Sequence, residues 1–129
     1  MVVWAGDRER AWATEIATQA ASCVRIAPRT NLYELVALVR RARIFIGSDT
    51  GPLHIAAAVG IPCIGLYGVT RVADCGPYGS QHVALQVQYQ EGTRRERRRA
   101  DNTAMCQITV EKVQAACDQI LARTSRAVA

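Results

Sequence analysis

The chain has 129 residues, half of them apolar, and a formal charge of +5. This length allows one domain with a substantial core, and the composition excludes disordered and fibrous proteins. No apolar stretch approaches the roughly 20 residues that cross a bilayer, and no signal peptide is recognisable, so we expect a cytoplasmic protein. Arg94–Arg99 alone carries +4 of the charge, so the sequence is near-neutral apart from one basic segment.

Five cysteines are scattered along the chain without a Cys-x-x-Cys pair: Cys23, Cys63, Cys75, Cys106 and Cys117. An odd number without short spacings fits neither a disulfide framework nor a zinc site. We therefore expect reduced thiols, most of them buried as small hydrophobic side chains, and no bound metal.

The first elements predicted are a strand at 2–5, a helix at 8–22 and a strand at 23–27. The predicted helix has one apolar face, on which the residues lie four apart: Trp12, Ile16 and Ala20. Asn31 and Glu34 then have the spacing of a capping box, which predicts a helix start. The apolar residues of that helix follow at the spacing of one face: Leu32, Leu35, Val36 and Val39.

The middle of the chain predicts a strand at 43–47, a helix at 52–59 and a strand at 62–67. Both strands are continuous apolar runs, which is typical of strands in the buried centre of a sheet. The alternation of strands and helices predicts an α/β fold with a Rossmann-like parallel sheet and flanking helices.

The last part of the chain predicts a loop after Gly68, a strand at 82–87 and a helix at 109–123. Residues 88–104 are polar and charged, and we expect a basic loop there. No internal repeat or boundary is visible, so residues 1–129 are predicted to form a single domain.

The chemistry is concentrated between the two middle strands. There a short polar turn, Ser48–Gly51, joins a strand to a helix that begins near Pro52. The free amides and the positive dipole of such a helix start attract anions, and glycine lets a ligand approach the backbone. His54 lies in the first turn, near any bound phosphate.

The next strand ends in a second glycine loop, which contains Gly68 and Thr70. Ligands of parallel sheets bind at the carboxyl ends of the strands, so the two loops predict a diphosphate site. The same turn chemistry also occurs as helix capping alone, and a lone helical histidine is often a packing or surface residue. From the residues alone, both interpretations of the turn stand.

Residues 49–70 read D-T-G-P-L-H-I-A-A-A-V-G-I-P-C-I-G-L-Y-G-V-T. This stretch resembles the signature of the ADP-heptose:lipopolysaccharide heptosyltransferases, glycosyltransferase family 9. Four flanking segments are similar to the family in the same order: Gly6–Glu9, Asn31–Leu35, Gly76-Pro77 and Met105–Val113. The resemblance covers roughly residues 3 to 124, and it implies the carboxyl-terminal lobe of a GT-B fold.

The resemblance also implies roles for single residues. Thr50 and Gly51 would present backbone amides to the donor diphosphate, while Asp49 orders the turn that begins at Ser48. His54 would lie beside the phosphates or the sugar. Glu9, after Gly6, would accept hydrogen bonds from the ribose hydroxyls. The remaining residues would border the pocket: Pro52, Gly68 and Thr70.

The implied reaction is inverting glycosyl transfer from a nucleotide sugar such as ADP-heptose, without a cofactor. In the family, the carboxyl-terminal domain begins earlier, with a strand, a polar loop and a phosphate-binding lysine. The only lysine in this chain is Lys112, and the lobe that holds the acceptor and the base is absent. Val69 and Arg71 also depart from the family pattern. We therefore expect no catalytic residue beyond a leaving-group role for His54, and no activity of the chain alone.

Four other functions compete. Ser48, Asp49 and His54 lie too close together for a hydrolase triad, and no Gly-x-Ser-x-Gly occurs. A P-loop ATPase is excluded because its motif is absent. The Pro-Leu-His sequence after the turn speaks against a nucleotide-sugar epimerase. A non-catalytic remnant or association module of the same fold remains as the alternative.

The remaining expectations concern partners. Arg94–Arg99 is a candidate contact for the lipopolysaccharide core or for the inner-membrane surface, with the protein peripheral there. No aromatic residues interleave with the arginines, so we expect no nucleic-acid binding. An exposed sheet edge would favour a homodimer.

Overall fold

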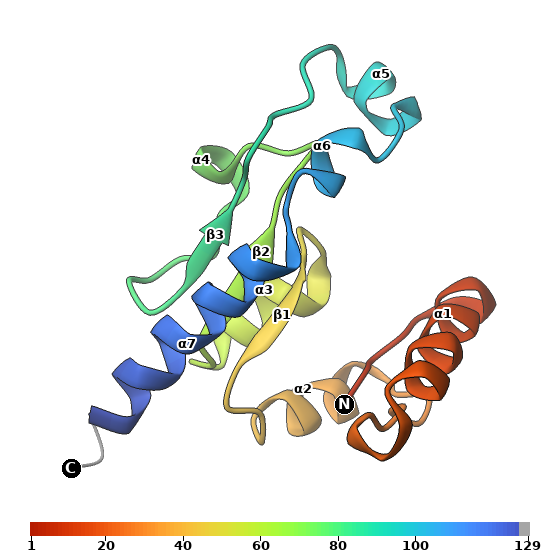
Figure 1. The fold of residues 1–129 in the computed structure, drawn as a ribbon, viewed down its shortest axis with the longest axis vertical. Helices are drawn as coiled ribbons and strands as arrows, with labels where there is room; N and C mark the ends of the chain where they lie inside the picture. Colours follow the sequence, from red (N-terminus) through yellow and green to blue (C-terminus); the bar gives the residue numbers. More distant parts are fainter. Residues whose placement is uncertain (127–129) are drawn as a thin grey trace. The chain divides into compact units, whose positions relative to one another are not determined.

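The computed structural model describes residues 1–126 (Figure 1), including all their side chains except those of Ala21, Arg94, Arg98, Ser125 and Arg126. The chain divides into two compact units, Met1–Leu35 and Val36–Ala129. Each unit is described by itself.

The first unit contains the helix α1 (Gly6–Gln19) and the short 3-10 helix η1 (Ala21–Cys23). The predicted strands at 2–5 and 23–27 meet only at one parallel bridge, between Val2 and Ile26. The Val2 amide donates to Arg25 O at 2.8 Å, and the Ala27 amide donates to Val2 O at 2.8 Å. The two segments are therefore paired as expected, but over too few residues to form strands.

The predicted apolar face of α1 is not buried. Trp12 is 50% exposed and Ile16 is 47% exposed, whereas Ala13 is 1% exposed. The Arg8 guanidinium lies 4.8 Å from the centre of the Trp12 ring. The predicted helix is confirmed by α1, but the spacing of its apolar residues does not identify the face that the fold covers.

The second helix, α2 (Leu32–Val39), begins as predicted. The Glu34 amide donates to Asn31 Oδ1 at 3.0 Å, and the Asn31 amide donates to Glu34 Oε2 at 2.8 Å. This reciprocal pair is a capping box, and it satisfies two amides that would otherwise lack partners at the helix start.

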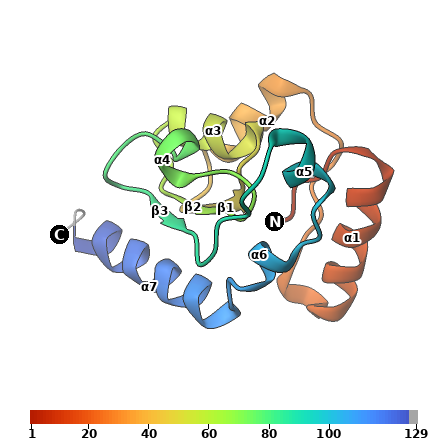
Figure 2. The same cartoon turned by 90° about the horizontal axis from the view of Figure 1, so that it is seen from above.

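The second unit is built on a parallel sheet of three strands: β1 (Phe45–Ser48), β2 (Cys63–Leu66) and β3 (Val83–Leu85). The order is β1-β2-β3, with Ile46 opposite Ile64 and Ile64 opposite Val83. The helices α3 (Gly51–Ala58) and α7 (Val110–Arg126) lie on opposite faces of the sheet (Figure 2). Helix, sheet and helix therefore form three layers.

The two apolar strands differ in burial, contrary to the expectation that both lie in the centre. In β2, Cys63, Ile64 and Gly65 are all buried. In β1, burial alternates along the strand, and Ile46 is 44% exposed. The reason is position, because β2 pairs on both sides while β1 pairs only with β2 among the described residues.

The core of the second unit lies between β2 and the last helix. Ile64 is fully buried against Ala116 and Ile120 of α7. On the α3 side, Leu53 is fully buried, and so is Tyr67 just beyond the end of β2. The helix that comes last in the sequence thus covers the strand at the centre of the sheet.

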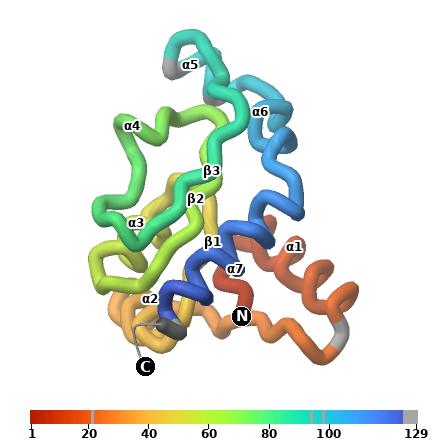
Figure 3. The backbone as a smooth tube through the Cα atoms, turned by 60° about the vertical axis from the view of Figure 1, so that its left-hand side comes forward, coloured from red at the N-terminus to blue at the C-terminus, as the bar shows by residue number. Residues whose placement is uncertain are grey.

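The connection at 88–104, expected as a basic loop, contains the helix α5 (Arg94–Arg99) and the start of α6 (Thr103–Cys106). Figure 3 follows the backbone from β3 through these helices into α7. The Glu96 amide donates to Thr93 Oγ1 at 3.3 Å, and the Thr93 amide donates to Glu96 Oε2 at 2.6 Å. This capping box stabilises a helix that was not predicted from the charged sequence. Another short helix, α4 (Val72–Cys75), was also not predicted.

All five cysteines are free thiols, but the expectation that most are buried was wrong. Only Cys63 is buried, while Cys23 and Cys106 are exposed. Burial raises the pKa of the Cys63 thiol to about 11, so this group stays protonated at neutral pH.

We expect Ile64→Ala to lower the free energy of unfolding by about 2–5 kcal/mol, because it leaves a cavity against α7. Ile46→Ala removes the same atoms from the neighbouring position in β1, where the side chain is 44% exposed. Its loss should be less than half as large. Urea unfolding measures both, and equal losses would show that Ile64 is not the centre of the core.

We also expect unfolding to become easier below about pH 6.5, the ordinary pKa of histidine, because burial lowers the pKa of His82. Its Nδ1 accepts from the Cys63 amide at 3.2 Å, so the neutral ring is bound and protonation breaks that bond. The folded state binds the proton less readily than the unfolded chain does, so stability present above this pH is lost as pH falls.

Thermal unfolding followed against pH measures this effect. His82→Asn should reduce the drop in melting temperature below pH 6.5. His54→Asn, the matched change at the other histidine, should retain the drop because His82 is intact. The same drop in the wild type and in His82→Asn would contradict the assignment.

Candidate functional site

The candidate site of the second unit lies at one edge of the sheet. Ser48 pairs in parallel with Leu66, so β1 and β2 end side by side. The turn after β1 leads into α3, and the loop after β2 begins at Gly68. The structure therefore brings both predicted loops to the carboxyl edge, where parallel sheets bind their ligands.

At this edge, the side chains of Asp49 and His54 are in contact. The Nε2 atom of His54 lies 2.8 Å from Oδ1 of Asp49. The His54 side chain is 46% exposed, whereas that of Asp49 is 15% exposed. The carboxylate therefore fixes the orientation of an imidazole whose other nitrogen, Nδ1, has no partner among the described residues.

Among the described residues, the start of α3 leaves the Gly51 amide without a partner, whereas the Leu53 and His54 amides donate to Thr50 O. Thr50 is the N-cap residue, but its side chain does not cap the helix and instead donates to Ser48 O at 3.3 Å. Pro52 has no amide hydrogen, and the Gly51 amide has no protein acceptor within residues 1–126. An unsatisfied amide at a helix start is a binding group for anions, because the helix dipole adds positive charge there.

Two residues that the sequence analysis did not select lie behind Asp49. Tyr67 is fully buried, and its hydroxyl donates to Cys75 O at 3.1 Å. Burial, and then the nearby charge of Asp49, raise the pKa of the Tyr67 phenol to about 12. Burial, and then the nearby charge of Asp49, also raise the pKa of the Cys75 thiol. Both groups therefore stay protonated around this carboxylate at neutral pH.

The second loop is held by protein contacts. A Cβ atom at Gly68 would lie 3.0 Å from the Met105 amide nitrogen, so glycine is needed for α6 to pack against the loop. The Gly68 carbonyl accepts from the Gln90 amide at 2.9 Å. Gly68 is buried, so it lies below the surface at this end of the sheet.

Gln86, also absent from the sequence prediction, fixes the rest of this loop. Its Nε2 donates to Thr70 O at 2.7 Å, and its Oε1 accepts from the Val72 amide at 3.3 Å. A glutamine after a strand carries no distinct sequence signal, because it is equally common on exposed surfaces.

Gly6 and Glu9 belong to the first unit. Gly6 has φ +77°, a conformation that side chains disfavour, and this lets α1 start directly after the bridge segment. One carboxylate oxygen of Glu9 accepts from the Ala5 amide at 2.7 Å, so Glu9 caps its own helix. A hollow of about 770 Å³ in this unit is lined by Gly6 with Trp4, Arg10 and Arg29 among others, but not by Glu9.

The described part of the chain offers neither a metal site nor a membrane-spanning helix. Residues 1–126 contain no group of three histidine, cysteine, aspartate or glutamate side chains that could hold a metal ion. None of the helices described there is long and apolar enough to cross a membrane.

The profile of glycosyltransferase family 9 (heptosyltransferase) matches residues 1–104. Lipopolysaccharide heptosyltransferase 3 of Escherichia coli is 34% identical over 97 residues, which are 74% of this chain and 28% of that protein. Lipopolysaccharide core heptosyltransferase OpsX of Haemophilus influenzae is 37% identical over 71 residues, 55% of this chain and 20% of that protein.

Two solved structures resemble the chain. The Escherichia coli heptosyltransferase WaaC, determined with ADP, has a TM-score of 0.73 at 22% identity and matches 91% of this chain and 32% of that one. A family 9 glycosyltransferase of Veillonella parvula has a TM-score of 0.76 at 21% identity and matches 92% and 35%. These similarities confirm the predicted fold class, a Rossmann-like lobe of a GT-B fold.

The chain therefore spans about a third of these structures and less than a third of the two relatives. The match to the family profile nevertheless covers most of its length, and it includes the turn after β1, the start of α3 and the second loop. The chain belongs to glycosyltransferase family 9, the heptosyltransferase family.

Proposed function

We propose that this chain is the donor-binding part of an inverting glycosyltransferase of lipopolysaccharide core synthesis. Its donor is a nucleotide sugar of the ADP-heptose kind, whose diphosphate binds at the start of α3. The observation that carries the proposal is the unsatisfied Gly51 amide beside a His54 ring that Asp49 orients at 2.8 Å. The determination of the similar WaaC with ADP supports the choice of nucleotide.

The chemistry of this edge suits a leaving diphosphate. An acceptor hydroxyl attacks the anomeric carbon, the bond to the diphosphate oxygen breaks, and negative charge develops on the departing phosphate. Backbone amides and the dipole of α3 stabilise that charge without reorganisation. With Nε2 bound to Asp49, a protonated His54 donates its Nδ1–H to a phosphate oxygen.

Asp49 acts as a positioning residue in this scheme. Its carboxylate holds Nε2 of His54 at 2.8 Å. The ring therefore has one preferred orientation before the ligand arrives, which reduces the entropy lost on binding. For the first unit, considered by itself, we propose the roles that the family resemblance implies: Glu9 accepts hydrogen bonds from ribose hydroxyls, and Gly6 contributes to nucleotide binding.

We expect ADP to shift the amide NMR signals of Thr50, Gly51, His54 and Gly68 saturably, with UDP and GDP binding more weakly. His54→Ala should weaken ADP binding about tenfold or more, because it removes a hydrogen bond to a charged group. Asp49→Ala should have a similar effect, and the double variant should be little worse than either, because the two residues act as a pair.

Asp118→Ala is the matched control, since it removes an exposed aspartate of α7. It should leave the ADP affinity within about twofold, because exposed charges far from a ligand are screened by salt. No saturable shift with any nucleotide would overturn the proposal and favour a non-catalytic remnant. Additive losses in the double variant would show that Asp49 does not act through His54.

We further expect the purified chain to transfer no heptose from ADP-heptose to a lipopolysaccharide-core acceptor. The chain spans about a third of the solved family structures, and we propose that the acceptor site and the base belong to the other lobe of the fold. A radiolabelled transfer assay measures this, with a full-length family 9 enzyme as the positive control. Turnover by the chain alone would show that these residues contain the whole catalytic site.

A further inference from the structure

A basic surface lies beside the second loop of the site. We define it by four arginines whose side chains are described: Arg71, Arg95, Arg97 and Arg99. Arg71 directly follows Thr70 of the second loop, while the others belong to α5. The Arg71 guanidinium lies 4.6 Å from the centre of the Tyr89 ring, and that of Arg97 lies 5.7 Å from the same centre. Tyr89 thus connects α5 to the loop after β2.

The charge of this surface is not neutralised within the described residues. Among them, the only ion pair is that of His54 with Asp49. Glu96, the acidic residue inside the arginine run, uses its carboxylate to cap α5, and hydrogen bonds from Thr93 lower its pKa. Arg97 donates only to the carbonyl of Gly92, at 2.6 Å. Four guanidinium groups therefore lack a carboxylate partner.

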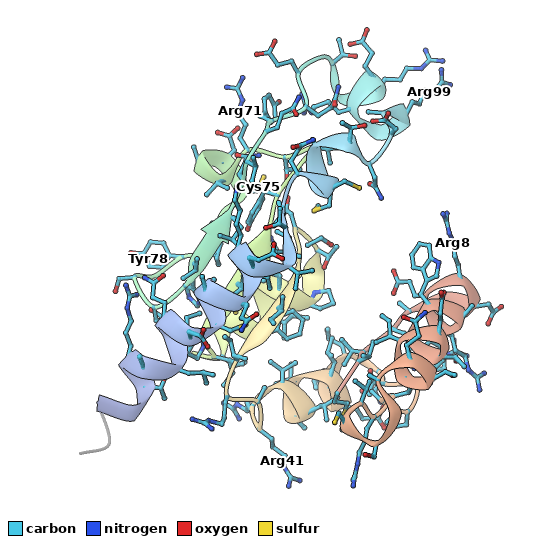
Figure 4. All side chains as sticks on the ribbon, viewed as in Figure 1. Arg8, Arg41, Arg71, Cys75, Tyr78 and Arg99 are labelled. Carbon is cyan, nitrogen blue, oxygen red and sulfur yellow. The ribbon has the colours of Figure 1, made fainter. Side chains whose placement is uncertain are left out.

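The surface projects outward. Arg71, Arg95 and Arg99 are exposed, and Arg97 is half-buried. Figure 4 shows Arg71 and Arg99 at the α5 end of the molecule, with their side chains pointing away from the sheet. None of the four arginines lines the hollow found in the first unit. Within the described part of the chain, these arginines lack acidic partners and lie on a helix and a loop that face outward. They therefore match an extended anionic surface better than a single small anion.

We propose that the basic surface binds the face of a bilayer that contains anionic phospholipids. Arginines near such a membrane are attracted to its negative surface potential. One guanidinium group can also bind two phosphate oxygens at once. The four arginines carry no exposed apolar neighbour within Arg94–Arg99 to insert among the acyl chains, so the contact is electrostatic and reversible by salt. Single-stranded nucleic acid is disfavoured because Tyr89, the aromatic ring of this surface, is in contact with the guanidinium groups.

This contact would give the site an orientation. Arg71 is covalently next to Thr70, so a membrane bound at Arg71 lies beside the second loop of the candidate site. A lipid-anchored acceptor would then approach the sheet edge from the bilayer. The membrane contact itself does not depend on the proposed donor site, because it needs no nucleotide.

The test is flotation of the 129-residue chain with vesicles of phosphatidylcholine, with and without phosphatidylglycerol, at low and high salt. We expect binding only to the anionic vesicles, and release at high salt because ions screen exposed charges. Arg95→Gln with Arg99→Gln should lower the fraction bound about tenfold or more. Arg40→Gln with Arg41→Gln removes the same charge from exposed positions at the end of α2, and it should change binding less than twofold.

A single change tests the role of Arg71, which no sequence run predicts. Arg71→Gln should reduce vesicle binding severalfold, whereas Arg40→Gln should not. Circular dichroism verifies that the variants remain folded. Absence of binding to anionic vesicles at low salt, equal losses in the two double variants, or tighter binding to an RNA homopolymer in the same buffer would each overturn the proposal.

Discussion

The parallel pairing of β1, β2 and β3 determines where the second unit can carry a ligand. Because neighbouring strands run in the same direction, each must return through a helix or a long loop, and every strand ends at the same edge. β2 is buried between β1 and β3 within the sheet and between α3 and α7 on its two faces. This burial stabilises the arrangement. The turn before α3 and the loop after β2 are close in space for that reason, although the helix α3 separates them in sequence. The position of the site follows from strand direction, and only its chemistry depends on individual side chains.

That chemistry converges on Asp49. Its partly buried carboxylate lies 2.8 Å from Nε2 of His54. Burial, and then the charge of Asp49, raise the pKa of the Tyr67 phenol and of the Cys75 thiol. Asp49 is therefore the acidic group that orders this edge, because it holds the His54 ring. The negative charge of Asp49 would repel a diphosphate, and in the proposed scheme the contacts with phosphate are made by the Gly51 amide and by His54 instead. This arrangement separates the group that orders the site from the groups that contact the ligand.

The parts of the fold that local sequence rules describe could be predicted. Capping residues predict the helix starts near Asn31 and Pro52. Periodicity predicts the strands of the second unit and the amphipathic helix α7. The carboxyl-edge position of the turn followed from the same pattern. The predictions that failed depended on tertiary neighbours: the edge position of β1 and the exposure of two cysteines. The exposure of Trp12 also depends on such neighbours, and the periodicity of α1 could not reveal it. The helix α5 was missed although Thr93 and Glu96 have capping-box spacing, because a run of like charges disfavours a helix unless the start is capped. Gln86 was missed because its role exists only through the loop that it holds.

The order of elements along the chain has a consequence for how the protein is made. Ile64, at the centre of the sheet, is covered by Ala116 and Ile120, which belong to the last helix. A ribosome releases β2 long before it releases α7, so the nascent sheet keeps an apolar face open while the arginine-rich segment is being translated. The strands can pair early, but the helix that covers them is available only after α7 has been translated. A chaperone that binds exposed aliphatic segments would therefore bind β2 and β3 during synthesis. It would be released once α7 packs against the sheet.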